Sequence, residues 1–587
     1  MGVTKLLSFA REAVPNGSFT IDIKEEIRKF YSSSTSTNPP APIIVVDLMC
    51  IVRPFIMLDA VGVLCGGRYN HISRQLDAFF GEMKNLGAEL AFFWDGPITM
   101  TTDDGWCKKR DHKYQTVIEL FDAVDQGFDI FDPNPDIIPF HYTATVKQVA
   151  MRHGRYYYAT SRECDQDMVA FANNSRALAI ITNDSDMLIY GGSWRFWCTN
   201  GLNMANLTIV EYDRVALRSF LQLSTAQMSL MATLVGNDII NSSELYNFHK
   251  VLGRSIDKIT NVADFILTNA NKSADGILIE ALEFCSNRRA LMKRFKMSLA
   301  IYNLEKQPFI SRIHGPIEDL LLSRGLSLFY NMWTSSSIQC SLDELDIRDE
   351  QLGQMVHTMI IAHIRRMGGI ILYKRQMQRR IVDYSKCHIL TKLQYEADYA
   401  CHEYSVEFPT HIEPPPLEDL LSDDPVLQHT LLDTKHELLS WILFKNIVQL
   451  PVDTIPQPLQ ITVFALYCLV ERKILMPFEA DLLLKVAHDV TCDQYDPDTV
   501  SYPQQLASRP FRVAFAFEKV YVSVAKAFNL VGLTNSVGGE LPFDGVLFHN
   551  WYDDWKNRRD GDETGMEEIE HLRLYKTIAT DNATDTE

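Results

Sequence analysis

The sequence predicts an α/β protein in which a parallel sheet, flanked by helices, is followed by a mainly helical C-terminal region. Between about residues 43 and 182, short aliphatic and aromatic runs alternate with stretches of helical spacing, the order typical of β-α-β units. The runs are largely apolar without alternation, as expected of strands that helices cover on both faces. From about residue 208 to 400 the pattern becomes mainly helical.

Each expected element of the α/β part has a local cause. The strand runs are rich in aliphatic and aromatic residues; they are IIVV (43–46), ELAFFW (89–94), YYYA (156–159) and LAIIT (178–182). We expect helices over about 72–86, over a long stretch ending near 150, and over about 163–175. A short opening helix precedes the polar break SSSTSTNPPAP (32–42).

The length of 587 residues predicts two or three domains, because a single core rarely grows beyond about 250 to 300 residues. The proline-rich, acidic stretch HIEPPPLEDLLSDDP indicates an interdomain linker or a lid. We expect an α/β domain over 1–250, a helical region over 251–410, this linker over 411–425, a helical domain over 426–551 and an acidic, disordered tail over 552–587.

The composition limits the classes of partner. A net charge of −19 argues against binding nucleic acid over the whole surface, so a nucleic-acid site would be local or bridged by metal. Eleven cysteines without a CxxC pair suit a reducing compartment. No stretch of about 18 uncharged apolar residues exists, so we expect an intracellular protein without a membrane partner.

Carboxylates follow all four expected strands. Parallel strands that end at the same edge of a sheet bring their following residues together, and this edge is where ligands of open α/β sheets bind. The acids are Asp47 after the first strand, Asp95 after the second, Glu163 and Asp165 after the third, and Asp184 and Asp186 after the fourth.

Crowded carboxylates repel one another, and a divalent cation removes that cost. Mg²⁺ or Mn²⁺ prefers oxygen ligands, and two such ions can hold the attacking and leaving oxygens of a phosphodiester. The alternative is that these acids are unrelated helix caps and surface residues. Four strands delivering acids to one edge favour the metal-site interpretation.

The order of these motifs resembles the flap endonuclease and XPG-type nucleases, which have a PIN-like fold. The matching stretches are MGV, VVDL, FFWDG, ECD, TNDSD and LVGND, and the last would add Asp238 as a seventh metal ligand and catalytic acid. The chain is also similar to the constitutive coactivator of PPAR-gamma family and the related asteroid proteins. This closer resemblance rests on APIIVVDLMC, CGGRYNH (65–71), GWCKKR, ECDQDMVAF, NDSDMLIY, LVGNDII and PFDGVLFHNW (542–551).

The sequence departs from the active nucleases at two places. Where they carry a basic residue after the second acid, this chain has Thr102 followed by two acids, and Lys108, Lys109 and Arg110 come later as candidate phosphate-binding residues. The stretch after Asp238 lacks the paired-glycine hairpin that grips duplex DNA in those enzymes. The alternative for the KKR cluster is a solvated helix face.

A second basic stretch, IRRMGGIILYKRQMQRR (364–380), combines six basic residues with Tyr373. Such a pattern suits a single-stranded backbone and one stacked base. The interpretation we favour is an amphipathic helix pair that contacts the acidic stretch at 413–424.

Two functions remain open. The first is a binding or scaffold protein of the coactivator type, acting in RNA or transcription regulation with its metal site retained. The second is a two-metal endonuclease acting on RNA or on single-stranded or flap DNA. The resemblance implies RNA or single-stranded DNA as partner, protein partners for the C-terminal helical region, and the nucleus as location, with the cytoplasm left open.

Overall fold

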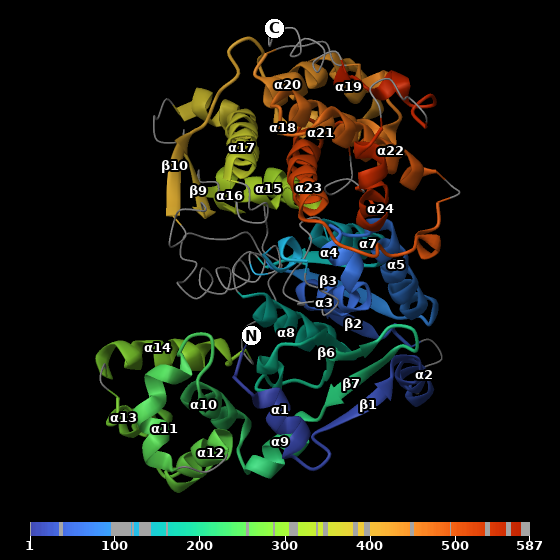
Figure 1. Cartoon of the computed structure of the whole chain (residues 1–587). Helices are drawn as coiled ribbons and strands as arrows, with labels where there is room; N and C mark the ends of the chain where they lie inside the picture. Colours follow the sequence, from blue (N-terminus) through green and yellow to red (C-terminus); the bar gives the residue numbers. More distant parts are fainter. Residues whose placement is uncertain are drawn as a thin grey trace. The chain divides into compact units, whose positions relative to one another are not determined.

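The structure is a computed structural model of the chain (Figure 1). It describes residues 2–34, 39–95, 119, 122–127, 142–159, 163–253, 257–285, 288–304, 315–335, 339–343, 350–379, 386–392, 400–446, 451–492, 495–534, 541–558 and 565–576.

Contacts divide the chain into two compact units. Unit 1 comprises Met1–Pro54, Asp77–Gly96 and Ala150–Ile313, and unit 2 comprises Phe55–Leu76, Pro97–Val149 and His314–Glu587. This division differs from the predicted boundary at residue 250. Residues 251–313 join unit 1 because their helices continue the core of the α/β part, whereas residues 55–76 pack with C-terminal helices.

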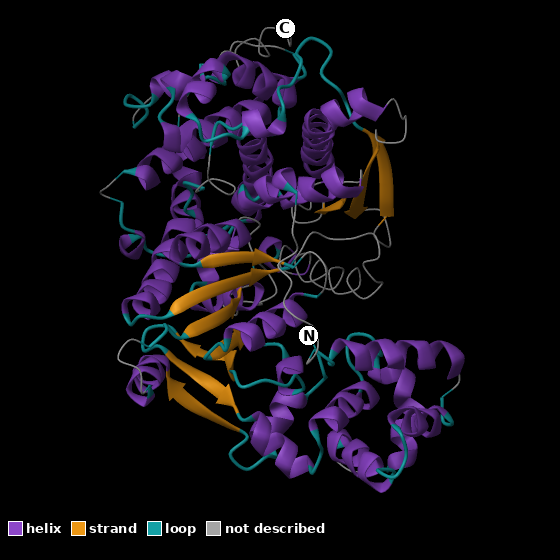
Figure 2. Ribbon diagram, turned by 180° about the vertical axis from the view of Figure 1, so that it is seen from behind, coloured by secondary structure: helices purple, strands orange, loops and turns teal. Residues whose placement is uncertain are grey.

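Unit 1 contains a seven-stranded sheet with the order β1-β7-β6-β5-β2-β3-β4. Figure 2 shows the strands of this sheet in orange. The five strands from β6 to β4 run parallel, and β7 and β1 extend the sheet in antiparallel fashion. The strands are β1 Ser18–Asp22, β2 Ile43–Asp47, β3 Glu89–Trp94, β4 Arg155–Tyr158, β5 Ala179–Thr182, β6 Arg195–Asn203 and β7 Thr208–Tyr212. The α/β class and the four strands expected from the sequence are confirmed, and β1, β6 and β7 are additions.

Helices surround the sheet and continue beyond it. α8 (Cys164–Ser175) packs across β2, β3 and β5. The other helices of this part are α1 Leu6–Glu12, α2 Ile23–Ser33, α9 Arg214–Leu221, α10 Thr225–Val235, α11 Tyr246–Leu252, α12 Lys258–Thr268, α13 Ala274–Leu282 and α14 Arg288–Ile301. Three helices are divided between the two units: α3 Leu48–Leu58, α5 Tyr69–Asn85 and α7 Tyr142–His153.

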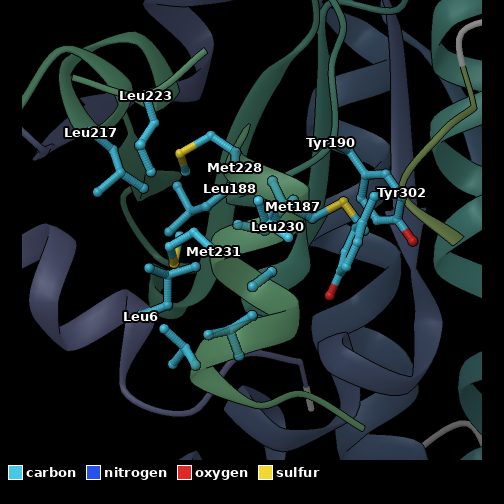
Figure 3. Close-up of a cluster of buried hydrophobic side chains, with 14 of the residues drawn as sticks. Leu6, Met187, Leu188, Tyr190, Leu217, Leu223, Met228, Leu230, Met231 and Tyr302 are labelled. Atoms are coloured by element: carbon cyan, nitrogen blue, oxygen red, sulfur yellow. The ribbon is translucent and has the colours of Figure 1, made fainter. Parts of the chain in front are cut away.

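The core of unit 1 is continuous from the sheet to the later helices. Figure 3 shows Met187 and Leu188, which follow β5, packed among side chains from α1, α9 and α10. α10 is buried on nearly all sides, and α12 and α14 both contact it. This core fixes the helices after α10 relative to the strand ends that carry the acids.

Unit 2 is mainly helical. Its long helices α17, α21 and α23 pack together, with α20, α22 and α24 beside them. The helices are α4 Ala60–Leu64, α15 Pro316–Ser323, α16 Ser327–Ser335, α17 Glu350–Arg379, α18 Leu417–Leu420, α19 Pro425–Thr430, α20 Leu432–Phe444, α21 Gln460–Glu471, α22 Pro477–Thr491, α23 Ser508–Leu530 and α24 Gly545–Lys556.

The region expected to be helical up to about residue 400 also contains strands. A small sheet has the order β10-β9-β8, formed by β8 Gln339–Asp343, β9 Lys386–Lys392 and β10 Ala400–Ser405. The basic stretch at 364–380 is not a helix pair, because residues 364–379 continue the single helix α17. Arg366 is buried, and both Arg365 and Arg366 pair with Glu407. These two arginines therefore stabilise the fold and are not available to bind a nucleic acid.

Two further expectations need correction. The stretch at 411–425 is not a free linker, because Leu420 and Leu421 are buried and Arg324 binds the carbonyl of Leu421 at 2.7 Å. The tail is ordered over its described residues, up to 558 and over 565–576: α24 extends to Lys556, Tyr575 is buried, and Arg573 pairs with Asp481. In both places leucines and aromatics among the acids provide the apolar surface that orders the segment.

Unit 2 contains a buried ionic group, the Arg68 cluster, formed by Arg68, Asp59, Asp544, Tyr495 and Tyr502. The Nε atom of Arg68 donates to Oδ2 of Asp544 at 3.0 Å, and its Nη1 atom lies 3.8 Å from Oδ2 of Asp59. Tyr502 donates to Asp59 at 2.9 Å, and Tyr495 donates to Asp544. The three charged side chains are only 1 to 3% exposed, so their charges depend on one another.

The backbone segments that carry Arg68 and Asp544 also lie in direct contact with each other. The amide of Gly545 donates to the carbonyl of Gly67 at 2.8 Å, and a Cβ atom at position 545 would lie 2.1 Å from the carbonyl oxygen of Cys65. The CGGRYNH and PFDGVLFHNW stretches therefore fit against each other, although their contact joins residues 476 positions apart.

Candidate metal centre

Seven acids form what we call the acidic edge of unit 1: Asp47, Asp95, Glu163, Asp165, Asp184, Asp186 and Asp238. β2 ends at Asp47, which is level with Phe93 of β3, and Asp95 follows that strand directly. β5 pairs with β2 on its other side, and Asp184 and Asp186 come in the short 3-10 turn after it. The parallel register therefore places these acids at one end of the sheet.

Helices supply the remaining three acids. Glu163 precedes α8 as its N-cap residue, and Asp165 lies in the first turn of that helix. Asp238 follows the C-terminal end of α10. Asp47, Asp184 and Asp186 are each about 5 or 6% exposed, so their carboxylates are withdrawn from bulk water.

The pKa values show that these acids lie within electrostatic reach of one another. Burial and the charge of Asp184 raise the pKa of Asp165 to about 7. Burial, followed by the charges of Asp184, Asp165 and Asp238, raises the pKa of Asp186 well above its ordinary range. Burial also raises the pKa of Asp184, with Asp238 and Asp47 adding to the effect.

The pKa of the Cys164 thiol shows that Asp95 also lies near this group of acids. Burial raises its pKa, and Asp47, Asp95 and Asp165 each raise it further. Acids from β2, β3 and α8 therefore act on one buried atom. The sequence interpretation that these strand-end acids gather at one place agrees with this electrostatic pattern.

Hydrogen bonds orient the most buried carboxylates. Thr182 donates from Oγ1 to Oδ2 of Asp47 at 2.8 Å, and the amide of Met49 donates to Oδ1 at 3.0 Å. Oδ1 of Asp184 accepts from the amide of Asp186 at 2.9 Å. These bonds compensate part of the cost of burial, but the mutual repulsion of the acids remains.

The start of the chain closes against the acidic edge. The amide of Gly2 donates to Oδ2 of Asp238 at 3.2 Å, and the amide of Val3 donates to Oδ1 of Asp186 at 3.1 Å. Gly2 has a φ of +83°, and a Cβ atom there would lie 2.4 Å from Oδ1 of Asp184. Glycine at this position is therefore required by both space and backbone conformation.

Two tyrosines contact the acidic edge that the sequence analysis did not identify. Tyr190 donates to Oδ2 of Asp165 at 2.9 Å, and a hydrogen bond from Tyr302 lowers the pKa of Asp186. Their ring centroids lie 5.3 Å apart at a tilt. Figure 3 shows the two side chains beside each other. Tyr190 follows Asp186 at helical spacing, which is a usable sequence signal, whereas Tyr302 is brought there only by the packing of α14.

The donor set fits a hard divalent cation in its chemistry. All seven members are carboxylates, the ligands that Mg²⁺ and Mn²⁺ prefer, and the nearby thiols of Cys50 and Cys164 have raised pKa values that keep them protonated. Within the described ranges, no three acidic, histidine or cysteine side chains are already disposed around a common ion position. Ion binding would therefore require some of these carboxylates to turn.

The candidate phosphate-binding residues Lys108, Lys109 and Arg110 lie outside the described residues, as does Thr102. Their expected contact with a phosphate stays a prediction.

Comparison with known proteins finds sequences that parts of this chain resemble. A family model for the FAM120A-like domain matches residues 221–306, which contain Asp238, α14 and Tyr302. The constitutive coactivator of peroxisome proliferator-activated receptor gamma from Bos taurus is 25% identical over 248 residues, or 42% of this chain. Over these stretches the chain is similar to the constitutive coactivators. The match spans only about a third of the bovine protein's own length, 35%.

Two solved structures are similar over a larger part of the chain. One is the catalytic core of Rad2 in complex with DNA substrate, at 13% identity and a TM-score of 0.29, covering 56% of this chain and 93% of that one. The other is human GEN1 in complex with Holliday junction DNA, at 15% identity and a TM-score of 0.31, covering 73% and 92%.

No helix in the described part of the chain combines the length and apolarity needed to cross a bilayer.

Proposed function

We propose that this chain is a nucleic-acid-binding protein of the coactivator type, whose acidic edge binds Mg²⁺ or Mn²⁺. The observation that carries the proposal is the group of buried acids whose charges raise one another's pKa values. Keeping such a group at the end of a sheet destabilises the fold unless a cation neutralises it. A bound divalent ion would supply the positive charge to which a phosphate oxygen binds.

The residues have distinct parts in this proposal. Asp184 and Asp186, on the turn after β5, are the central ligands, and the charges of Asp47 and Asp165 act on them. Tyr190 and Thr182 orient two of these carboxylates by the hydrogen bonds described above. Asp95, Glu163 and Asp238 are more exposed and complete the set toward solvent.

Replacing Asp184 with asparagine is expected to lower the affinity for Mn²⁺ at least about tenfold. The change removes one negative charge, and an asparagine oxygen can still accept the amide of Asp186, so the turn after β5 is kept. Isothermal titration of the full chain with Mn²⁺ measures the affinity. The matched control is Asp213→Asn, since Asp213 only caps α9. Equal affinities in wild type and Asp184→Asn would refute the metal site.

RNA or single-stranded DNA is the proposed partner of unit 1, and protein partners are proposed for the helical region over 426–551. The relatives are named as coactivators of a nuclear receptor, which makes a receptor of that kind the first protein to test and the nucleus the proposed location. Capture of a purified receptor domain by the full chain tests this part of the proposal. Absence of capture at high concentration would count against it.

A second candidate function is a two-metal endonuclease acting on RNA or on single-stranded or flap DNA. It is favoured by acids arriving from β2, β3, β5 and α8 together, since two ions in such a site stabilise both the attacking and the leaving oxygen. Labelled substrates of each kind, incubated with Mn²⁺, distinguish the two functions. Cleavage that Asp184→Asn with Asp186→Asn abolishes would establish a nuclease, and binding without cleavage would leave recognition as the function.

A further inference from the structure

α14 is a basic helix in an acidic protein. Its sequence, RRALMKRFKMSLAI, has five Lys and Arg and no acid. The stretch matched by the FAM120A-like model, residues 221–306, carries ten Lys and Arg against eight Asp and Glu, whereas the whole chain has a net charge of −19. A local positive surface of this kind is what a nucleic-acid site requires in such a chain.

The orientation of α14 is fixed by its buried face. Leu291 and Phe295 pack into the core of unit 1, and Ser298 is fully buried. The hydroxyl of Ser298 lies 2.7 Å from Oγ1 of Thr233 and accepts from Nδ2 of Asn237 at 2.7 Å. Because this face cannot leave the core, the helix has no apolar face to insert into a lipid surface.

Three basic residues form a stripe on the opposite side. Arg289, Lys293 and Lys296 have the i, i+4, i+7 spacing that aligns side chains along one helix face, and all three are exposed. Arg289 and Lys293 have no ion pair within the described ranges. Lys296 lies 3.2 Å from Asp275 with both side chains 58% exposed, a pairing that water and salt weaken.

The other two arginines of the helix are engaged in the fold. Arg294 pairs with both oxygens of Glu244 and binds the carbonyl of Ile239, and Arg288 donates to the carbonyl of Glu283 at 2.9 Å. The stripe is thus separate from the arginines that hold α14 in place.

The C-terminal end of α14 lies at the acidic edge. Tyr302, which follows its last residue, accepts a hydrogen bond from Asn237 at 3.1 Å and contacts Asp186. At about 1.5 Å per residue, the stripe covers a path of about 10 Å that ends about 9 Å, measured along the axis, before Tyr302. A chain of phosphates lying along the stripe would therefore point to the proposed metal site.

We propose that Arg289, Lys293 and Lys296 bind the sugar-phosphate backbone of a nucleic acid and direct it to the acidic edge. This inference rests on the proposed nucleic-acid function and names its second contact surface. Flexible lysines and arginines at this spacing contact phosphates without reading bases, so we expect binding with little sequence preference.

The test measures binding of the full chain to fluorescein-labelled polyuridine and polythymidine by anisotropy at several salt concentrations. The variant Arg289→Gln, Lys293→Gln is expected to bind about tenfold more weakly. The slope of its log binding constant against log salt concentration should fall by the amount that corresponds to about one to two phosphate contacts. The matched control, Arg28→Gln, Lys29→Gln, changes the same charge on the exposed side of α2 and should bind like wild type.

Three outcomes would overturn the inference: no binding of either oligonucleotide by wild type, equal loss in the α2 control, or displacement by polyglutamate as readily as by oligonucleotide. The last would make the stripe a site for acidic protein segments. The Mn²⁺ titration separates this inference from the metal site, because the α14 variant should keep its Mn²⁺ affinity and Asp184→Asn should not. Absence of Mn²⁺ binding by the wild type, with oligonucleotide binding kept, would refute the metal site and leave the stripe intact.

Discussion

Replacing Arg68 with methionine is expected to lower the free energy of unfolding of unit 2 by about 3 to 5 kcal/mol. The substitution leaves the carboxylates of Asp59 and Asp544 buried without their counter-charge, and an unpaired buried charge costs more than the loss of the pair itself. Hydrogen exchange followed by mass spectrometry on the full chain measures the change, in peptides from α4 and α24.

The control is Arg74→Met, because Arg74 pairs with Asp496 at 3.4 Å with both side chains half exposed. Such a surface pair contributes at most about 1 kcal/mol. Adding Asp544→Asn to Arg68→Met should recover part of the loss, since asparagine removes the unpaired charge and can still cap α24 through Leu547. Equal effects of the Arg68 and Arg74 changes would contradict the buried-cluster explanation.

The stability of unit 1 without divalent cations is expected to fall as the pH rises from about 4 to about 7. Asp165 has a pKa of about 7 in the folded chain against an ordinary value of 3.8. In this pH range the folded form holds a proton that the unfolded form has lost, so raising the pH favours unfolding. The stability loss should be complete above the folded-state pKa. Chelated protein unfolded by urea at several pH values provides the measurement.

Asp165→Asn should remove the part of the pH-dependent stability loss that Asp165 causes. In chelator at pH 7.5 it should raise the free energy of unfolding of unit 1 by about 2 to 4 kcal/mol. The neutral side chain avoids the repulsion of Asp184 and can still accept the bond from Tyr190. Asp264→Asn, on the exposed face of α12, is the control and should leave the pH profile unchanged. A stability that rises between pH 4 and 7 in chelator would contradict the raised pKa.

The sequence predicted the central strands well because their apolar runs depend only on local composition. β2, β3 and β5 lie inside the sheet with α8 packed on them, and their residues are accordingly apolar and buried, whereas β4 (RYYY) is an edge strand whose tyrosines are only half-buried. β1 reads SFTID with exposed positions in its middle, and its place at the sheet edge comes from pairing with β7 far along the chain. Such a strand has no local signature, so only the tertiary pairing reveals it.

The acidic edge was predictable for a similar reason. A rule that joins strand ends to ligand sites acts on local sequence, and it selected the acids after four strands, whose role as metal ligands stays a prediction. Tyr302 and the α14 stripe could not be found in this way, because their position depends on how α14 packs on α10. The Arg68 cluster shows the same limit: both of its motifs stood out in the sequence, but their contact did not.

The contact between Arg68 and Asp544 also limits how early during synthesis this part of the chain can fold. Arg68 and Asp544 are 476 positions apart, so a ribosome working at about 5 to 20 residues per second needs roughly 25 to 95 seconds between them. During that interval Arg68 and Asp59 have no Asp544 to complete their cluster. Nascent chains that stop before residue 541 should therefore expose the segment around α4 and become clients of chaperones, whereas chains reaching α24 can bury it.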